Sequence, residues 1–127
     1  MNAKTRVLVV DDNVVDAKGL KEMLVERGFE AHRVSSGVDA IGALASQTWK
    51  PEVMVLDYLM PGLDGGDVLS AMRTIHELHQ IPVVILSAYE VPPEVQRHAD
   101  VVLKKPLDLG KLVEAIRLVV RLGKEQT

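Results

Sequence analysis

The stretch that decides the fold is "VMVLDYLMPGLDGG", from Val53 to Gly66. An apolar run leads into a single acid, Asp57, and then breaks up in proline and glycine. A continuous apolar run bounded by turn residues is typical of a strand that is covered on both faces. A carboxylate at the tip of such a strand is costly unless it is paired. Asp57 is therefore either an accident at a strand end or a residue that something binds.

Similar apolar runs recur along the chain and alternate with helical patterns. Helices are expected from Asn13 to Arg27, after Ser36, after Asp64, and over the periodic stretch from Leu109 to Val120. Five alternations of strand and helix predict an α/β fold, with a parallel sheet, right-handed crossovers and helices on both faces. The expected strands are 6–10, 30–34, 52–56, 82–86 and 101–103.

Composition limits the function classes. The 127 residues suit one domain over 1–127, and 47% hydrophobic with 26% charged residues is ordinary for a globular protein. The net charge of −3 and few aromatics argue against direct nucleic-acid binding. The absence of cysteine excludes disulfide and thiol chemistry and fits a reducing, cytoplasmic location. The longest apolar run, "IPVVILSAY", is about half of a membrane span, so no membrane partner is expected.

Polar side chains stand at the ends of four of the five strands. Asp11 and Asp12 follow the first strand, Asp57 ends the third, Ser87 follows the fourth and Lys105 follows the fifth. In open parallel sheets, ligands bind beyond the carboxyl ends of the strands. The sequence therefore predicts that three carboxylates, a hydroxyl and an amine converge at one edge.

Crowded carboxylates must be neutralised by protons or by a cation, because two charges about 4 Å apart repel by about 4 kcal/mol in a protein-like dielectric. An all-oxygen ligand set favours a hard ion such as Mg²⁺, with Mn²⁺ as a substitute. A hydroxyl and an ammonium opposite the metal suit the remaining oxygens of a transferred phosphoryl group. This chemistry makes Asp57 a nucleophile that accepts phosphoryl as an acyl phosphate.

Each of these residues also has a simpler interpretation. Asp11 and Asp12 could cap the first helix, and Asp57 could be a turn residue. Ser87 could be a loop serine and Lys105 a solvated lysine. The joint occurrence at successive strand ends favours a site over these alternatives.

With these residues in place, the chain resembles the response-regulator receiver domains of two-component signalling. The resemblance rests on "VLVVDDN", "VLDYLMPGLDG", "ILSA" and "LKKP", in this order, and extends from about Arg6 to Leu122. It implies a doubly wound, flavodoxin-like sheet with strand order 2-1-3-4-5 and often a cis peptide bond before Pro106. It also implies that a sensor histidine kinase or a histidine phosphotransfer protein supplies the phosphoryl group to Asp57.

The same resemblance assigns roles to the other site residues. It implies that Asp12 ligates the metal directly, that Asp11 acts through water, and that the backbone carbonyl of Leu59 is a further ligand. It implies that Ser87 binds a phosphoryl oxygen when the domain switches and that Lys105 pairs with the phosphate. An output protein of unknown identity would read the switched surface, and the chain would not be a turnover enzyme.

Two positions depart from the family pattern. The family usually carries an aromatic residue three positions before the lysine, where this chain has Val102. In the family this aromatic side chain rotates inward as the Ser or Thr at the end of the fourth strand moves. A valine side chain is too short to do so, and this coupling is therefore in question. Tyr89, close to Ser87, could replace it or could be an exposed loop tyrosine.

The segment 88–100 is short for a loop, a helix and a turn, so Pro92 and Pro93 are expected to start a stunted or irregular fourth helix of two turns at most. Leu59 places an apolar side chain beside Asp57. We expect it to hinder the attacking water and to slow loss of the phosphoryl group.

Other functions and weaker signals stay open at this point. An aspartate-nucleophile phosphatase is disfavoured because its second acid usually stands two positions after the nucleophile. A receiver-like module that works without phosphate and a flavodoxin-like cofactor binder are further alternatives. His76 and His79 could form a metal pair at helical spacing, and Trp49 is expected to pack at a helix end.

Overall fold

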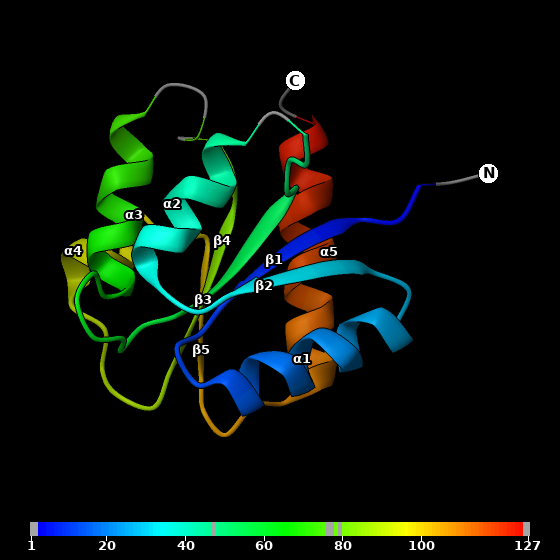
Figure 1. Ribbon diagram of the computed structural model, residues 1–127, viewed down its shortest axis with the longest axis horizontal. Coiled ribbons are helices and arrows are strands. Elements are labelled where there is room, and N and C mark those ends of the chain that lie inside the picture. The colour runs from blue at the N-terminus through cyan, green and yellow to red at the C-terminus, as the bar shows by residue number, and fades with distance from the viewer. Residues whose placement is uncertain (1–2, 47, 76–77, 79, 126–127) are drawn as a thin grey trace.

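The computed structural model describes residues 3–46, 48–75, 78 and 80–125. It shows a five-stranded parallel sheet in the order β2-β1-β3-β4-β5, flanked by helices on both faces (Figure 1). The expected α/β fold and strand order are therefore confirmed. In chain order the elements are β1 (Arg6–Val10), α1 (Val14–Glu26), β2 (Glu30–Val34), α2 (Gly37–Ala45), β3 (Val53–Asp57), α3 (Gly65–Thr74), β4 (Val83–Ser87), α4 (Pro93–Gln96), β5 (Val101–Lys104) and α5 (Leu109–Glu125).

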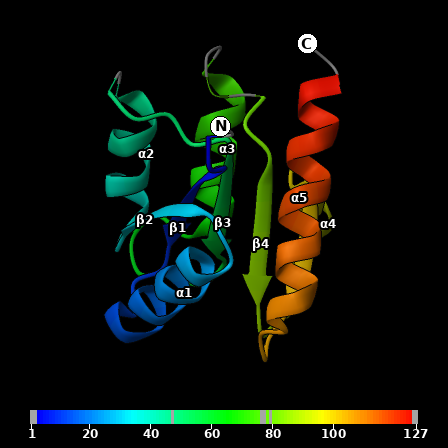
Figure 2. The same cartoon turned by 90° about the vertical axis from the view of Figure 1, so that its right-hand side faces the viewer.

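The sheet separates two apolar clusters. Helices α1 and α5 pack in one cluster, and α2, α3 and α4 pack in the other. Figure 2 shows α2 and α3 on one side of β4 and α5 on the other. Successive residues of β1 alternate between the clusters, with Val7 in one and Leu8 in the other, as the period of a strand requires. Strands β3 and β4 are buried along their whole length, which explains their continuous apolar sequences.

Side chains close the N-termini of the helices that follow β1 and β3. Asn13 caps α1, because its Oδ1 accepts a hydrogen bond from the backbone N–H of Asp16 at 3.0 Å. The alternative that Asp11 or Asp12 caps this helix is therefore wrong. Asp64 caps α3, in agreement with the helix expected after this residue. It forms a reciprocal capping box with Asp67.

The loop between β3 and α3 folds tightly back onto the strand tip. The N–H of Gly65 donates to the carbonyl oxygen of Tyr58 at 2.8 Å. A Cβ atom on Gly65 would lie 2.9 Å from Cα of Tyr58 and 3.0 Å from the carbonyl oxygen of Asp57. Only glycine fits this approach, so Gly65 fixes where the chain leaves Asp57.

The fourth helix is a single turn of four residues, shorter even than the two turns that the sequence allowed. An arginine of α3 holds the chain after it: Arg73 donates to the carbonyl oxygens of His98 and Ile81 and pairs with Asp100 at 3.3 Å. The carboxylate of Asp100 also accepts the N–H of Val83 at 2.8 Å. The end of the α4 segment is therefore tied to α3 and β4.

Trp49 stacks on His32 at the far end of the sheet, with ring centroids 4.0 Å apart, and donates to Glu30 at 3.1 Å. The expectation of simple packing at a helix end missed this pair. His76 and His79, considered as a metal pair, lie outside the described residues. Among the described residues, no helix combines the length and the apolar character that crossing a bilayer requires.

Candidate functional site

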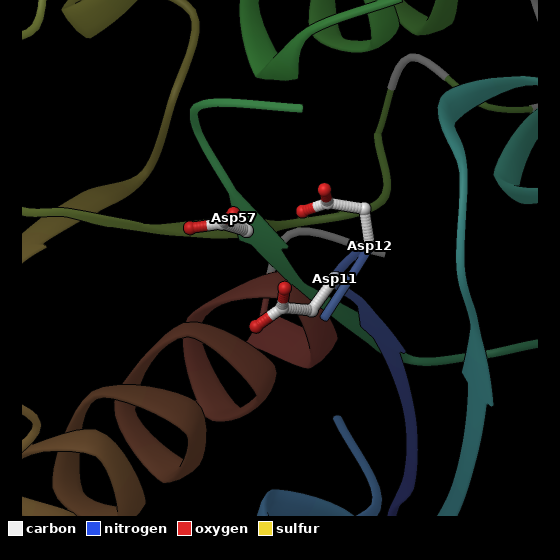
Figure 3. A group of neighbouring side chains, drawn as sticks. All are labelled: Asp11, Asp12 and Asp57. Atoms are coloured by element: carbon white, nitrogen blue, oxygen red, sulfur yellow. The ribbon is translucent and has the colours of Figure 1, made fainter. Parts of the chain in front are cut away.

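The three predicted carboxylates meet at the carboxyl edge of the sheet. Strands β1 and β3 are neighbours, with Val10 opposite Leu56, so the residues after Val10 lie beside Asp57. Asp11, Asp12 and Asp57 each offer a carboxylate oxygen within 4.8 Å of the others (Figure 3). Asp57 is 7% exposed, and Asp12 lies on the open side of the group. The register of two parallel strands thus builds the acidic cluster.

Lys105 completes the group from the other side. Its Nζ lies 2.8 Å from Oδ1 of Asp57, and the two residues are 48 positions apart in the chain. Partial burial opposes the charged form of Lys105, but the hydrogen bond and the charge of Asp57 outweigh it and raise the pKa of the ammonium above 10.5. The buried carboxylate is therefore paired, as its place at a strand tip demands.

The surroundings of Asp11 disfavour the ionised form of its carboxyl. Burial is the largest cause that raises the pKa of its carboxyl above 3.8, and the negative charge of Asp57 adds to it. A hydrogen bond from the backbone N–H of Asn13, 2.9 Å long, works in the opposite direction. A cation among the three carboxylates would relieve this repulsion.

Ser87 is the last residue of β4, which pairs with β3 so that Asp57 faces Leu86. Ser87 is 3% exposed. Its Oγ donates to the carbonyl oxygen of Tyr89 at 2.8 Å and accepts the N–H of the same residue at 3.0 Å. The hydroxyl is thus at the predicted edge and is engaged with the loop that follows its own strand.

The donor set fits a hard divalent cation. Three carboxylates without a thiolate match the oxygen preference of Mg²⁺, which is commonly held by one or two carboxylates together with water. Leu59, two residues after Asp57, is 51% exposed, so its side chain stands in solvent at the rim of the cluster. The cis peptide bond expected before Pro106 is present between Lys105 and Pro106.

One contact that shapes the site was not found by sequence reasoning: the backbone of Tyr89 binds the Ser87 hydroxyl. The sequence marks Gly65 as part of a turn and helix start, and the structure shows that it also sets the path of the loop after Asp57. The glycine pair at 65–66 was a visible signal, since glycine after a strand-end acid suggests a close backbone approach. The Tyr89 contact had no such signal, because any residue has the backbone groups that it uses.

A groove of about 310 Å³ opens beside the site. Asp11 and Lys105 lie in its wall, together with Leu20 and Met23 of α1 and Leu107 after β5. The groove joins an apolar surface to the charged cluster.

Comparisons with known proteins agree with this geometry. The family model described as "Response regulator receiver domain" matches residues 7–117. Among curated proteins, the transcriptional regulatory protein PcoR of Escherichia coli is 31% identical over 125 residues, which cover 95% of this chain and 54% of that protein. The two-component response regulator ARR7 of Arabidopsis thaliana is 31% identical over 128 residues, which cover 91% of this chain and 62% of that protein.

The fold is also similar to solved structures of receiver domains. A CheY-like response regulator receiver domain protein from Methanospirillum hungatei superimposes with a TM-score of 0.84 at 27% identity, covering 97% of this chain and 99% of that one. The receiver domain of the Francisella response regulator 1452 gives 0.82 at 28% identity, covering 93% and 98%. The chain spans roughly half to two thirds of the length of the curated relatives named above. Sequence, fold and site together show that the chain belongs to the response regulator receiver domain family.

Proposed function

We propose that this chain is a phosphoacceptor switch of a two-component phosphorelay, with Asp57 as the acceptor. The observation that carries the proposal is the pairing of Lys105 with Asp57 at 2.8 Å beside the carboxylates of Asp11 and Asp12. One buried carboxylate is thus held between an ammonium and a cation-binding cluster, which is the environment that phosphoryl transfer to a carboxylate needs.

In this proposal Asp11, Asp12, Asp57 and the carbonyl of Leu59 hold Mg²⁺, or Mn²⁺ in its place. When bound, the metal neutralises charge on the phosphoryl oxygens and on the clustered carboxylates. Asp12 is the exposed member and Asp11 the partly buried one. This difference fits direct ligation by Asp12 and ligation through water by Asp11.

The chain's own groups perform the transfer. An oxygen of Asp57 attacks the phosphorus of a donor phosphohistidine, the phosphorus–nitrogen bond breaks, and the imidazole leaves with its electron pair. Lys105 stays close enough to pair with a phosphoryl oxygen, and its raised pKa keeps it charged. After the Ser87 hydroxyl releases the carbonyl of Tyr89, it donates a hydrogen bond to another phosphoryl oxygen. The chemistry occurs on the protein itself, without turnover of an external substrate.

The partners follow from the same chemistry. The donor is a sensor histidine kinase or a histidine phosphotransfer protein, and the groove beside Lys105 is the surface we assign to it. An output protein reads the phosphorylated form. We propose that residues 1–127 act as one receiver domain, whether alone or within a longer protein, in the cytoplasm, where kinases find their ATP.

The test is incubation with Mg²⁺ and acetyl phosphate, followed by intact mass. The proposal predicts one added phosphoryl group that needs Mg²⁺ and is absent in Asp57→Asn. Asp64→Asn, which changes a carboxylate outside the cluster, should still be phosphorylated. A modified Asp57→Asn variant, or no modification of the parent protein, would contradict the proposal.

A further inference from the structure

Another cavity lies between the ends of α2 and α3, away from the carboxylate cluster. The two helices run side by side and end at the same edge of the molecule (Figure 1). The cavity has a volume of about 270 Å³ and borders Pro51, shortly before β3, whereas Asp57 is the last residue of that strand. Because a strand rises about 3.3 Å per residue, β3 puts roughly 15 Å between the cavity and Asp57. The two sites are therefore separate.

Most of the cavity wall is apolar. It contains two almost fully buried leucines, Leu44 of α2 and Leu78 after α3. It also contains three half-buried isoleucines, Ile41, Ile75 and Ile81. Covering these side chains removes apolar surface from water, which is favourable. The wall therefore suits an aliphatic ligand.

Lys50 is the one charged side chain in the described part of this wall. It is exposed and therefore belongs to the open side of the cavity. Its ammonium forms no ion pair with any residue that the structure describes. The carboxylate of nearby Glu52 is already shared between Arg6, at 3.6 Å, and Lys124, at 3.4 Å. The Lys50 ammonium thus favours an anionic group on the ligand.

The ends of the two helices decide the orientation of such a ligand. Helix α2 ends at Ala45 and α3 ends at Thr74, so both carbonyl ends lie at this edge of the molecule. The carbonyl end of a helix carries a partial negative charge and disfavours a nearby anion. The anionic group therefore belongs beside Lys50 on the open side, and the apolar chain belongs among the isoleucines.

Three hydrogen bonds hold parts of the wall in place. Arg73 of α3 donates to the carbonyl oxygen of Ile81 at 3.1 Å, and Nε of Arg6 donates to the carbonyl oxygen of Lys50. The indole of Trp49, next to Lys50, donates to a carboxylate of β2 at 3.1 Å. The cavity is thus formed before a ligand enters it, and binding costs little conformational freedom.

The volume limits the length of the ligand. A methylene group takes about as much room as a water molecule, about 30 Å³, so 270 Å³ holds roughly nine such groups. We propose that this cavity binds a free aliphatic carboxylate of about eight carbon atoms, with its carboxylate at Lys50 and its chain between α2 and α3. This site is additional to the phosphoacceptor site and does not depend on it.

The first test measures how affinity depends on chain length. The protein, labelled at its isoleucine methyl groups, is titrated with butanoate, hexanoate, octanoate and decanoate below their micelle-forming concentrations and followed by NMR. The methyl signals of Ile41, Ile75 and Ile81 should shift, whereas those of Ile85 and Ile116, fully buried elsewhere, should not. Affinity should rise about threefold to fourfold per added methylene up to octanoate. It should then level off, because a longer chain no longer fits.

The second test reverses the charge at the open side. Lys50→Glu should weaken octanoate binding at least about fivefold, because it replaces an attraction by a repulsion. Lys18→Glu, at an exposed lysine of α1, is the control and should leave the affinity unchanged. Octylamine carries a similar chain with a positive charge. It should bind the parent protein more weakly than octanoate does, and it should bind Lys50→Glu more tightly than octanoate does.

Three results would overturn the proposal. The first is the absence of a shift at Ile41, Ile75 and Ile81 with every carboxylate. The second is an equal effect of Lys50→Glu and Lys18→Glu on octanoate binding. The third is an affinity that keeps rising with chain length through decanoate, as non-specific adsorption would give. Neither test uses Mg²⁺ or a phosphoryl donor, so failure here leaves the phosphoacceptor proposal untouched.

Discussion

The two halves of the site are built differently. The carboxylate half stands on β1 and β3, with all five residues of β3 buried, and leads into a ten-residue α3 closed by a capping box. The other half stands on β4 and β5. Strand β5 is only partly buried, and α4 has four residues and no side-chain cap. Strand β4 is as deeply buried as β3, so the difference lies in the segments that follow the two strands: a capped ten-residue helix after β3, and an exposed loop with a single helical turn after β4.

Under the proposed function, this difference matches the role of each half. Carboxylates that share a cation need fixed separations, because an ångström of drift changes both repulsion and ligation. A hydroxyl that must change partners needs a segment of low local stability, with few buried contacts. Residues 88–90 are exposed and have that property. The comparison teaches that the tight packing of the site lies in the strands and in the loop after β3, whereas the exposed part lies in the loop after β4.

The largest expected effect breaks the carboxylate half. Asp12→Asn should slow phosphorylation by acetyl phosphate at least about 100-fold at low Mg²⁺, because a charged ligand is lost. The exposed position means that folding should be unaffected. Rates come from intact mass against time at several Mg²⁺ concentrations. Asp39→Asn, in the first turn of α2, should react at the parent rate, and equal rates in the two variants would exclude Asp12 as a ligand.

The next effect tests how rigidly the carboxylate half is packed. Gly65→Ala should lower the free energy of unfolding by about 2 kcal/mol, since its Cβ would meet backbone at 2.9 Å. Gly42→Ala, inside α2 with nothing within 4 Å of the added carbon, should raise it by up to about 1 kcal/mol. Urea unfolding followed by Trp49 fluorescence measures both. Equal stability of the two variants would show that the loop after Asp57 shifts to accommodate the added carbon.

A smaller effect concerns the rim between the halves. Leu59→Asn should speed loss of the phosphoryl group by about threefold to tenfold, or about 1 kcal/mol of barrier, because a polar side chain admits and orients water. Leu63→Asn changes another exposed leucine of the same loop and should leave the lifetime unchanged. Decay of the phosphorylated mass after removal of the donor gives the rates, and an unchanged lifetime in Leu59→Asn would remove the shielding role.

The smallest effect sharpens the electrostatic side of the comparison. The folded state raises the pKa of Asp11 above 3.8, so the folded protein holds that proton more tightly than the unfolded one. The contribution of Asp11 to the free energy of unfolding is then fully present below pH 3.8, and it is lost as the pH rises through the raised pKa. Without metal at neutral pH, Asp11→Asn should gain about 0.5 kcal/mol, a small value because the side chain is partly exposed and screened.

The gain in Asp11→Asn should vanish below about pH 3.8, where the parent carboxyl is protonated in both states. Unfolding in urea at several pH values, with chelator present, measures it. Glu22→Gln on α1 serves as the control for loss of one negative charge. A gain that is the same at every pH would point to packing rather than charge.

The sequence predicted the sheet and the group of residues at its edge because both follow from short-range patterns. Apolar runs marked the strands, and the polar residues that ended them had to meet wherever parallel strands end together. Asp57, Asp12 and Lys105 were found in this way. The short fourth helix followed from counting residues between Ser87 and Lys105.

What the sequence did not predict depends on hydrogen bonds between side chains and backbone groups. The N-cap of α1 is Asn13, one residue beyond the acids first considered, and its side chain accepts the N–H of Asp16. The Arg73 network joins α3 to the carbonyl of His98, and Tyr89 binds Ser87 through groups that every residue has. Residue type carries no sign of such partners.

The two apolar clusters on either side of the sheet share no residue, although successive residues of β1 feed them in turn. Substitutions in one cluster should therefore add to those in the other with little coupling in stability. Under the proposed function, selection can then change the packing beneath the α1 and α5 face without disturbing the packing beneath α2, α3 and α4, and the reverse. A duplicated copy of this protein could therefore change the helices on one face of the sheet while it keeps the packing on the other face.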